Sequence, residues 1–271
     1  MSSAPLRIVR LAAQVRARLA ASAGEVGRVH SVFSRAINVE CAGGRLLAVH
    51  GPGPLLAPFS VAVDDALRLS SIRPGEQIAF GARTRAADSL ALAWESAAAV
   101  DCSAADALEA SAVAPAHLPE LRVRGAPSLD SPLGVQARAE LAEGIARGDA
   151  RRVLAAARRL IGLGEGLTPA GDDCLVGALA VLHRARVPWL TGDASPAVAI
   201  AHAAHGRTTA VGREFILHAL DGFFSEPVLA VLRAASPDEA RGAAAGLLGL
   251  GATSGADTLA GMRLACQALR S

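Results

Sequence analysis

The chain changes its hydrophobic rhythm near residue 125, and this change constrains the fold more than any other feature. From about Gly24 to Gly125, short apolar segments of strand length alternate with breaks such as AGG and GPGP. Residues 125–134, GAPSLDSPLG, form a joint rich in proline, glycine and serine, and segments with helical spacing follow it. The pattern predicts an α+β chain, with a strand-rich domain over 1–125 (a sheet or a small barrel) and a mainly α-helical domain over 126–271.

The first domain begins with LRIVRLAAQVRARLAASAG (6–24), which we interpret as an amphipathic opening helix. Arg10, Arg16 and Arg18 interrupt the apolar core that a signal peptide needs. No run reaches the roughly 18 apolar residues of a membrane span. The segment RAADSLALAWESAAAVDCS (85–103) is compatible with either a strand or a helix.

The composition excludes several classes of function. The net charge of +2 comes from dispersed arginines and aromatic residues are only 3%, so nothing supports nucleic-acid binding. The four cysteines form no CxxC pair, which argues against a zinc site or a disulfide framework and fits a reducing cytoplasm. The chain contains no lysine, which excludes a Walker A lysine and a Schiff-base lysine. We expect a cytoplasmic protein without membrane or nucleic-acid partners.

The most unusual stretch is GLGEGLTPAGDD (162–173), which leads into the apolar segment DDCLVGALAVLHRARV. Thr168 before Pro169 is typical of a helix start, with a hydroxyl N-cap and proline at the first helical position. The helix predicted over 169–187 is apolar on nearly all sides, so it is expected to be buried. Two adjacent aspartates, Asp172 and Asp173, therefore lie in a buried first turn, where an unpaired carboxylate costs several kcal/mol.

This motif occurs again near the end of the chain. GLTPAGDDCLVG (166–177) and GATSGADTLAG (251–261) both read G-x-T and then G-x-D-x-L-x-G once one residue is removed, so Asp173 corresponds to Asp257. A looser relative, HGRTTAVGREFILHALDG (205–222), lies between them. Helix N-termini bind anions, and we expect the helix starts near Thr168, Thr208 and Ser254 to face one cleft. In the alternative structural interpretation, Ser254 to Asp257 is a plain capping box.

The site predicted from these motifs contains three acidic residues and a set of anion-binding residues. The acidic residues, which would orient N–H groups or hold a metal, are Asp172, Asp173 and Asp257. The residues expected to bind the anion are Gly164, Gly166, Thr168, Gly171, Arg207, Thr208, Thr209, Thr253, Ser254 and Gly255. Gly206 and Gly251 are expected to line the approach. His202 with His205 is interpreted as a surface or core pair, Cys174 as a core residue, and Arg213 with Glu214 as a solvated pair.

In order along the chain, GLGEGLTPAGDDCLVGALAVLH, the TT-containing helix start and GATSGADTLAGM resemble the signature blocks of the AllH family. The specific resemblance covers about residues 160–265, and Gly212 departs from it because a serine usually stands there. The resemblance implies a subunit of oxamate carbamoyltransferase, which interconverts oxalurate plus phosphate with carbamoyl phosphate plus oxamate in allantoin degradation. It also implies larger partner subunits, or a homo-oligomer.

Three functions stay open at this point. In the first, the chain is a carbamoyltransferase subunit whose helix N-termini hold phosphate while the aspartates orient the carbamoyl group, with no cofactor. In the second, the aspartates hold Mg²⁺ in a phosphoryl-transfer or hydrolytic enzyme. In the third, the chain is a non-catalytic regulatory subunit that binds a small anionic metabolite.

Overall fold

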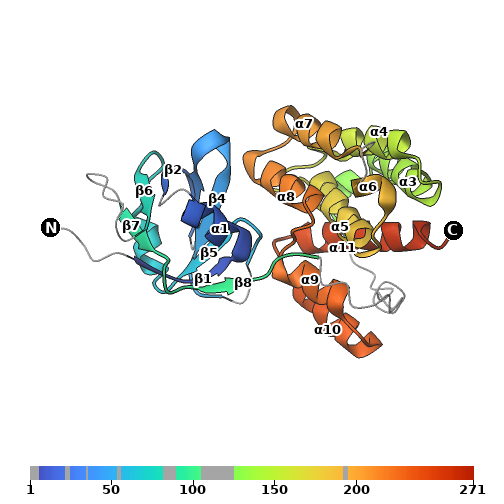
Figure 1. Ribbon diagram of the computed structural model, residues 1–271. Helices are drawn as coiled ribbons and strands as arrows, with labels where there is room; N and C mark the ends of the chain where they lie inside the picture. The colour runs from blue at the N-terminus through green and yellow to red at the C-terminus, as the bar shows by residue number, and fades with distance from the viewer. Residues whose placement is uncertain are drawn as a thin grey trace. The chain divides into compact units, whose positions relative to one another are not determined.

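The computed structural model describes residues 6–21, 25–34, 36–53, 56–81, 90–104, 125–191 and 195–271. The chain divides into two compact units, Met1–Cys102 and Ser103–Ser271. The first unit contains strands and the second contains helices (Figure 1), which confirms the α+β class expected from the sequence. The boundary at residue 125 stays a prediction.

The first unit is a closed barrel. Its strands are β1 (Leu6–Ala12), β2 (Glu25–Val32), β3 (Ala36–Glu40), β4 (Leu46–His50), β5 (Ser60–Val63), β6 (Gln77–Phe80), β7 (Leu90–Ala93) and β8 (Ala98–Val100). Seven strands follow one another in the order β5-β4-β3-β2-β6-β7-β1, and pairing of β1 with β5 closes the ring. The interior is filled by apolar side chains such as Ile37, Val49 and Phe80, each fully buried. The sheet-or-barrel alternative is therefore decided in favour of the barrel.

The opening segment differs from its prediction, because only its second half is helical. Leu6–Ala12 form strand β1, and helix α1 covers Ala13–Ala21. Leu6 and Ile8 are buried while Arg7 between them is exposed, an alternation that suits a strand. β1 also pairs with β5, β7 and β8, so barrel closure outweighs the helical pattern that we read in the sequence. The ambiguous segment 85–103 contains strands β7 and β8 in its described part.

The second unit is helical. Its helices are α3 (Pro132–Ala146), α4 (Ala150–Leu160), α5 (Ala170–Arg184), α6 (Pro188–Thr191), α7 (Ala197–Arg207), α8 (Ala210–Leu220), α9 (Glu226–Arg233), α10 (Pro237–Leu248) and α11 (Ser254–Ala268). Helix α5 is buried at every position from Ala170 to Leu182, as its all-round apolar sequence predicts. Helices α4, α8, α9 and α11 pack against it. Within the described residues, none of the helices has the length and apolar character needed to cross a bilayer.

Candidate functional site

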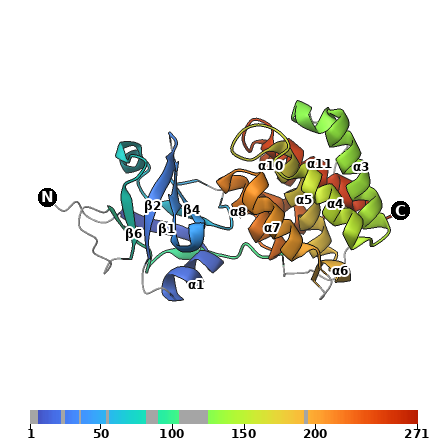
Figure 2. The ribbon, with the colours of Figure 1, turned by 90° about the horizontal axis from the view of Figure 1, so that it is seen from above.

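Helices α5 and α11, which carry the two copies of the repeated motif, lie side by side and in very close contact (Figure 2). A Cβ atom at Gly177 would lie 2.0 Å from the carbonyl oxygen of Thr258. A Cβ atom at Gly261, the matching position of the second copy, would lie 1.8 Å from the carbonyl oxygen of Cys174. The last glycine of each copy thus lets the backbone of one helix touch the backbone of the other.

The earlier glycines of the two copies also match in their contacts. A Cβ atom at Gly171 would lie 2.0 Å from the carbonyl oxygen of Leu160 at the end of α4. One at Gly255 would lie 1.9 Å from that of Leu247 near the end of α10. The hairpins α4–α5 and α10–α11 are therefore built alike, and these two glycines have a packing role that the sequence analysis did not foresee. Their predicted role in anion binding stays a prediction.

The three helix starts lie close together, and the single cleft that the repeated motif predicts them to face stays a prediction. The Thr168 Oγ1 atom, just before α5, lies 2.8 Å from the Ser254 Oγ atom at the start of α11. The Thr208 hydroxyl, just before α8, donates a hydrogen bond to Asp172 in the first turn of α5. The starts of three helices, each with a partial positive charge, are thus gathered around the carboxyl groups of Asp172 and Asp173.

The caps predicted for two of these helices are wrong. The N-cap of α5 is Pro169 rather than Thr168, and no side chain in the described part of the chain caps this helix. The N-cap of α11 is Thr253, again without a side-chain capping bond, so Ser254 to Asp257 is not a capping box. The Thr168 and Ser254 hydroxyls bond to each other across the two helix starts instead. Thr209 does act as an N-cap, because its hydroxyl accepts a hydrogen bond from the Gly212 N–H of α8 at 2.9 Å.

Asp172 joins the starts of α5 and α8 and has both of its oxygens occupied. Oδ1 accepts the backbone N–H of Gly162 at 2.7 Å, and Oδ2 accepts the Thr208 hydroxyl. Gly212 leaves room for this carboxylate, since a Cβ atom there would lie 2.2 Å from Oδ2. Burial raises the pKa of Asp172, while the hydrogen bonds from Thr208 and Gly162 lower it. Asp172 is therefore a bridge within the protein.

Asp173, its neighbour, is buried but has an unused hydrogen-bonding atom. Its Oδ2 atom has no hydrogen-bond partner among the described residues. Burial raises the pKa of Asp173 to about 8, against the lowering effect of the Ser254 and Thr168 hydroxyls. The negative charges of Asp257 and Asp172 raise this pKa further. Burial thus favours the neutral carboxylic acid, which both donates and accepts hydrogen bonds.

Asp257, the counterpart of Asp173 in α11, faces a different environment. Its Oδ1 atom accepts the backbone N–H of Ala126 at 2.9 Å, and its Oδ2 atom has no hydrogen-bond partner in the described part of the chain. Burial raises its pKa, while the Ala126 N–H, the Thr253 hydroxyl and the positive charge of Arg138 lower it. Gly125 approaches so closely that a Cβ atom there would lie 2.6 Å from Oδ1.

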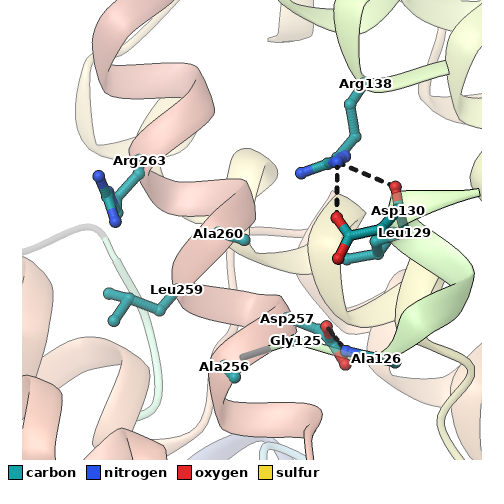
Figure 3. Close-up of a pocket in the computed structure, with 10 residues that line it drawn as sticks. All are labelled: Gly125, Ala126, Leu129, Asp130, Arg138, Ala256, Asp257, Leu259, Ala260 and Arg263. Carbon is teal, nitrogen blue, oxygen red and sulfur yellow. Dashed lines mark hydrogen bonds and ion pairs between the residues drawn. The ribbon is translucent and has the colours of Figure 1, made fainter. Parts of the chain in front are cut away.

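A pocket of about 170 Å³ adjoins Asp257 within the helical unit (Figure 3). It is lined by Gly125, Ala126, Leu129, Asp130, Arg138, Ala256, Asp257, Leu259, Ala260 and Arg263. Arg138 reaches from α3 to Asp130, at an Nη2–Oδ1 distance of 3.4 Å, and to the carbonyl oxygen of Leu129. The lining thus includes two acidic residues, of which Asp257 is buried and Asp130 pairs with Arg138, and a second arginine, Arg263.

The remaining predicted site residues lie near the helix starts with fewer contacts. Arg207 is exposed at the end of α7, and its carbonyl oxygen packs against Gly162. At Gly166 and Gly206, no atom of the described residues lies within 4 Å of the position that a Cβ atom would take. A Cβ atom at Gly164 would lie 3.0 Å from the Ser128 hydroxyl oxygen. Whether these residues and Thr209, Gly251 and Thr253 contact a ligand stays a prediction.

Other residues that the sequence singled out were not expected to belong to the site. His202 and His205 are exposed, and Cys174 is a fully buried core residue whose pKa burial raises to about 12. The described residues contain no group of three or more His, Cys, Asp or Glu side chains that could hold a metal ion.

The prediction that Arg213 and Glu214 form a solvated pair is wrong. Glu214 is fully buried, and its Oε1 and Oε2 atoms lie 4.0 Å from Arg213 Nη2 and 3.7 Å from His218 Nε2. Helix α8 packs against both α5 and α7, which places this face of the helix in the interior.

Arg138, Ser128 and the backbone of residues 125–126 were not predicted from the sequence as site residues. The segment 125–134 reads as a joint, yet it brings Ala126 to Asp257, and the buried Ser128 hydroxyl oxygen has no hydrogen-bond partner among the described residues. Arg138 could have been found, because it falls in the buried stripe of α3 with Gly134, Ala137 and Leu141. A charged residue in an apolar stripe is unusual enough to mark a polar site.

Fold and geometry define a two-unit α+β protein whose helical unit gathers buried, incompletely hydrogen-bonded polar atoms at two paired helix starts. Comparison with protein families matches residues 160–266 to the oxamate carbamoyltransferase subunit AllH and residues 7–106 to the AllH family N-terminal domain. The chain belongs to the AllH family, which supports a role as a carbamoyltransferase subunit. A comparison with solved structures gives no match.

Proposed function

We propose that this chain is a carbamoyltransferase subunit that binds carbamoyl phosphate where the starts of α5, α8 and α11 meet. The observation that carries the proposal is the 2.8 Å contact between the Thr168 and Ser254 hydroxyls beside the buried, partly unpaired Asp173. Partner subunits fit this role, since the matching family is described as a subunit. The small anionic metabolite in this proposal is carbamoyl phosphate.

The phosphate group suits the helix starts. Backbone N–H groups in the first turn of a helix lack intrahelical partners and carry partial positive charge, so they stabilise an anion. The hydroxyls of Thr168 and Ser254 can turn to donate to phosphate oxygens. No described atom lies within 4 Å of the Cβ position of Gly166, and we propose Arg207, whose backbone carbonyl oxygen contacts Gly162, as a further phosphate ligand.

The carbamoyl group suits Asp173. A neutral carboxylic acid donates through its O–H and accepts through its C=O, which matches the C=O and N–H of an amide. Because the pKa of Asp173 is raised to about 8, the acid is mainly protonated at pH 7 and does not repel the phosphate. In the proposed role, Asp173 orients the carbamoyl group and Asp172 holds the α5 and α8 starts together. Transfer of a carbamoyl group needs no organic cofactor, and the proposal includes none.

Calorimetric titration of the full chain with carbamoyl phosphate, and separately with inorganic phosphate, tests the proposal. We expect Asp173→Ala to weaken carbamoyl phosphate binding by about 10- to 100-fold, as for the loss of hydrogen bonds to a buried polar group, and to affect phosphate less. Thr168→Val should weaken both ligands.

The matched control is Asp238→Ala, an exposed aspartate on α10, which should change neither affinity. Binding of neither ligand to the wild-type chain, or unchanged affinity in Asp173→Ala, contradicts the proposal. Binding that depends on added Mg²⁺ would instead support metal-dependent phosphoryl transfer.

A further inference from the structure

The pocket beside Asp257 contains two buried polar atoms whose hydrogen-bonding capacity is unused. Asp257 is fully buried, and its Oδ2 atom has no hydrogen-bond partner within the described residues. The same holds for the Nε atom of Arg138. The two hydrogen bonds that the Arg138 guanidinium makes to described residues, to Leu129 and to Asp130, both use Nη2. Buried polar atoms in native proteins are nearly always paired, so an unpaired acceptor and an unpaired donor lining one pocket indicate a ligand with the complementary groups.

The size and lining of the pocket restrict that ligand. Its volume of about 170 Å³ is below the roughly 300–1,000 Å³ of pockets for drug-sized molecules, so only a molecule of few atoms fits. A guanidinium binds carboxylates strongly. A buried carboxyl oxygen without a partner requires an N–H or O–H donor. The ligand therefore carries a carboxylate at one end and an N–H group at the other.

We propose that this pocket binds the carbamoyl acceptor, a small amide-carboxylate of the oxamate type, with its carboxylate on Arg138 and its amide N–H on Asp257 Oδ2. This inference rests on the proposed function, because it assigns the second substrate of the same reaction. Oxamate is the compound in the family's description, and it joins a carboxylate directly to an amide. The segment 125–126, which reads as an interdomain joint in the sequence, becomes part of the acceptor site.

The pocket also lies close to the proposed carbamoyl phosphate site. The charge of Asp257 is one of the causes that raise the pKa of Asp173, so the two carboxyl groups interact electrostatically. Asp173 and Asp257 occupy equivalent positions in the two copies of the motif, on two helices in backbone contact. Donor and acceptor would therefore bind to the two copies of one motif, with their amide groups toward each other. Proximity of this kind is the main requirement for group transfer between two bound molecules.

The test is calorimetric titration of the full chain with oxamate and with inorganic phosphate as separate probes, on the wild type and on two arginine variants. Arg138→Met should weaken oxamate binding by about 10- to 100-fold and leave phosphate binding unchanged, since it removes charge-assisted hydrogen bonds from the pocket alone. Arg147→Met is the matched control, because Arg147 lies just after the same helix, is 67% exposed and pairs with Glu143. It should change neither affinity. Melting temperatures check that each variant is folded.

The outcomes separate this inference from the proposed function. Oxamate affinity that is unchanged in Arg138→Met, with phosphate still bound at the helix starts, overturns the acceptor pocket and leaves the proposed function standing. An equal loss of oxamate and phosphate in Arg138→Met also overturns it, because one shared site would then hold both. A wild-type chain that binds oxamate but not phosphate supports the pocket and contradicts the phosphate site. Binding of neither probe to the wild type overturns both.

Discussion

The starts of α5 and α11 have nearly the same sequence and the same backbone contacts, yet they present different chemistry. Gly171 and Gly177 in one copy, and Gly255 and Gly261 in the other, make matching contacts with carbonyl oxygens. Asp173 lies beside two hydroxyls and a second aspartate, whereas its counterpart Asp257 lies beside a backbone N–H and an arginine. The repeated motif determines how the helices pack, and residues outside the motif determine what each aspartate can bind.

The largest expected effect tests whether the last glycine of each copy has the same packing role. Gly177→Ala and Gly261→Ala should each lower the free energy of unfolding by about 3 kcal/mol, because a Cβ atom would lie 2.0 Å or 1.8 Å from a carbonyl oxygen. Urea denaturation followed by circular dichroism measures this. Gly242→Ala on α10 is the control, since no described residue has an atom within 4 Å of its Cβ position, and it should be neutral or stabilise by up to ~1 kcal/mol. If only one of Gly177→Ala and Gly261→Ala lowers the free energy of unfolding strongly, the two copies of the motif do not pack in the same way.

The second prediction concerns the one acidic position at which the copies differ, Asp172 in the first and Ala256 in the second. Asp172→Ala makes the α5 start resemble the α11 start and leaves the Gly162 N–H and the Thr208 hydroxyl without their acceptor. We expect a loss of about 1–3 kcal/mol in the free energy of unfolding. Urea denaturation measures the loss, and faster hydrogen exchange at the Gly162 amide would localise it. Unchanged stability would mean that Asp172 does not hold the α5 and α8 starts together.

The third prediction uses the raised pKa of Asp173. A carboxyl group whose pKa rises from 3.8 to about 8 on folding stabilises the folded state fully below pH 3.8, and this contribution is lost as pH rises toward 8. Asp173→Asn cannot ionise, so its melting temperature should exceed that of the wild type by several degrees more at pH 8 than at pH 5. Its affinity for carbamoyl phosphate should persist above pH 8, where that of the wild type falls.

A matched measurement on Asp238→Asn, an exposed aspartate, should give the same difference from the wild type at both pH values. If Asp173→Asn behaves in the same way, the carboxyl group is ionised in the folded protein, and the neutral-acid role proposed for it is excluded.

The smallest expected effect is the coupling between the two copies through their hydroxyls. Thr168→Val and Ser254→Ala each remove one partner of the 2.8 Å hydrogen bond. A double-mutant cycle on the free energy of unfolding should give a coupling of about 1 kcal/mol, which is typical of one hydrogen bond. A coupling of zero would mean that the two starts are energetically independent despite their contact.

Much of the fold could be predicted from the sequence because it depends on local pattern. Helices α3, α4 and α5 could be predicted from the spacing of apolar residues. The ends of α3 and α4 could be predicted because Gly148 and Gly162, which follow them, adopt positive φ angles that favour glycine. The opening segment could not be predicted, because β1 is a strand only through its partners β5, β7 and β8. Long-range pairing of this kind leaves little trace in the local sequence.

For the candidate site, the sequence by itself determined the repeated motif, the burial of its aspartates and the expectation that its helix starts meet. Only the tertiary structure decided that Thr168 and Ser254 bond to each other instead of capping their helices. It also decided that Asp172 has both oxygens hydrogen-bonded, while Asp173 and Asp257 each keep one oxygen without a partner among the described residues. It alone brought Arg138 and Ala126 to Asp257. The physical reason is that hydrogen-bond partners and pKa values depend on groups distant in the chain, whereas helix periodicity depends on neighbours in the chain.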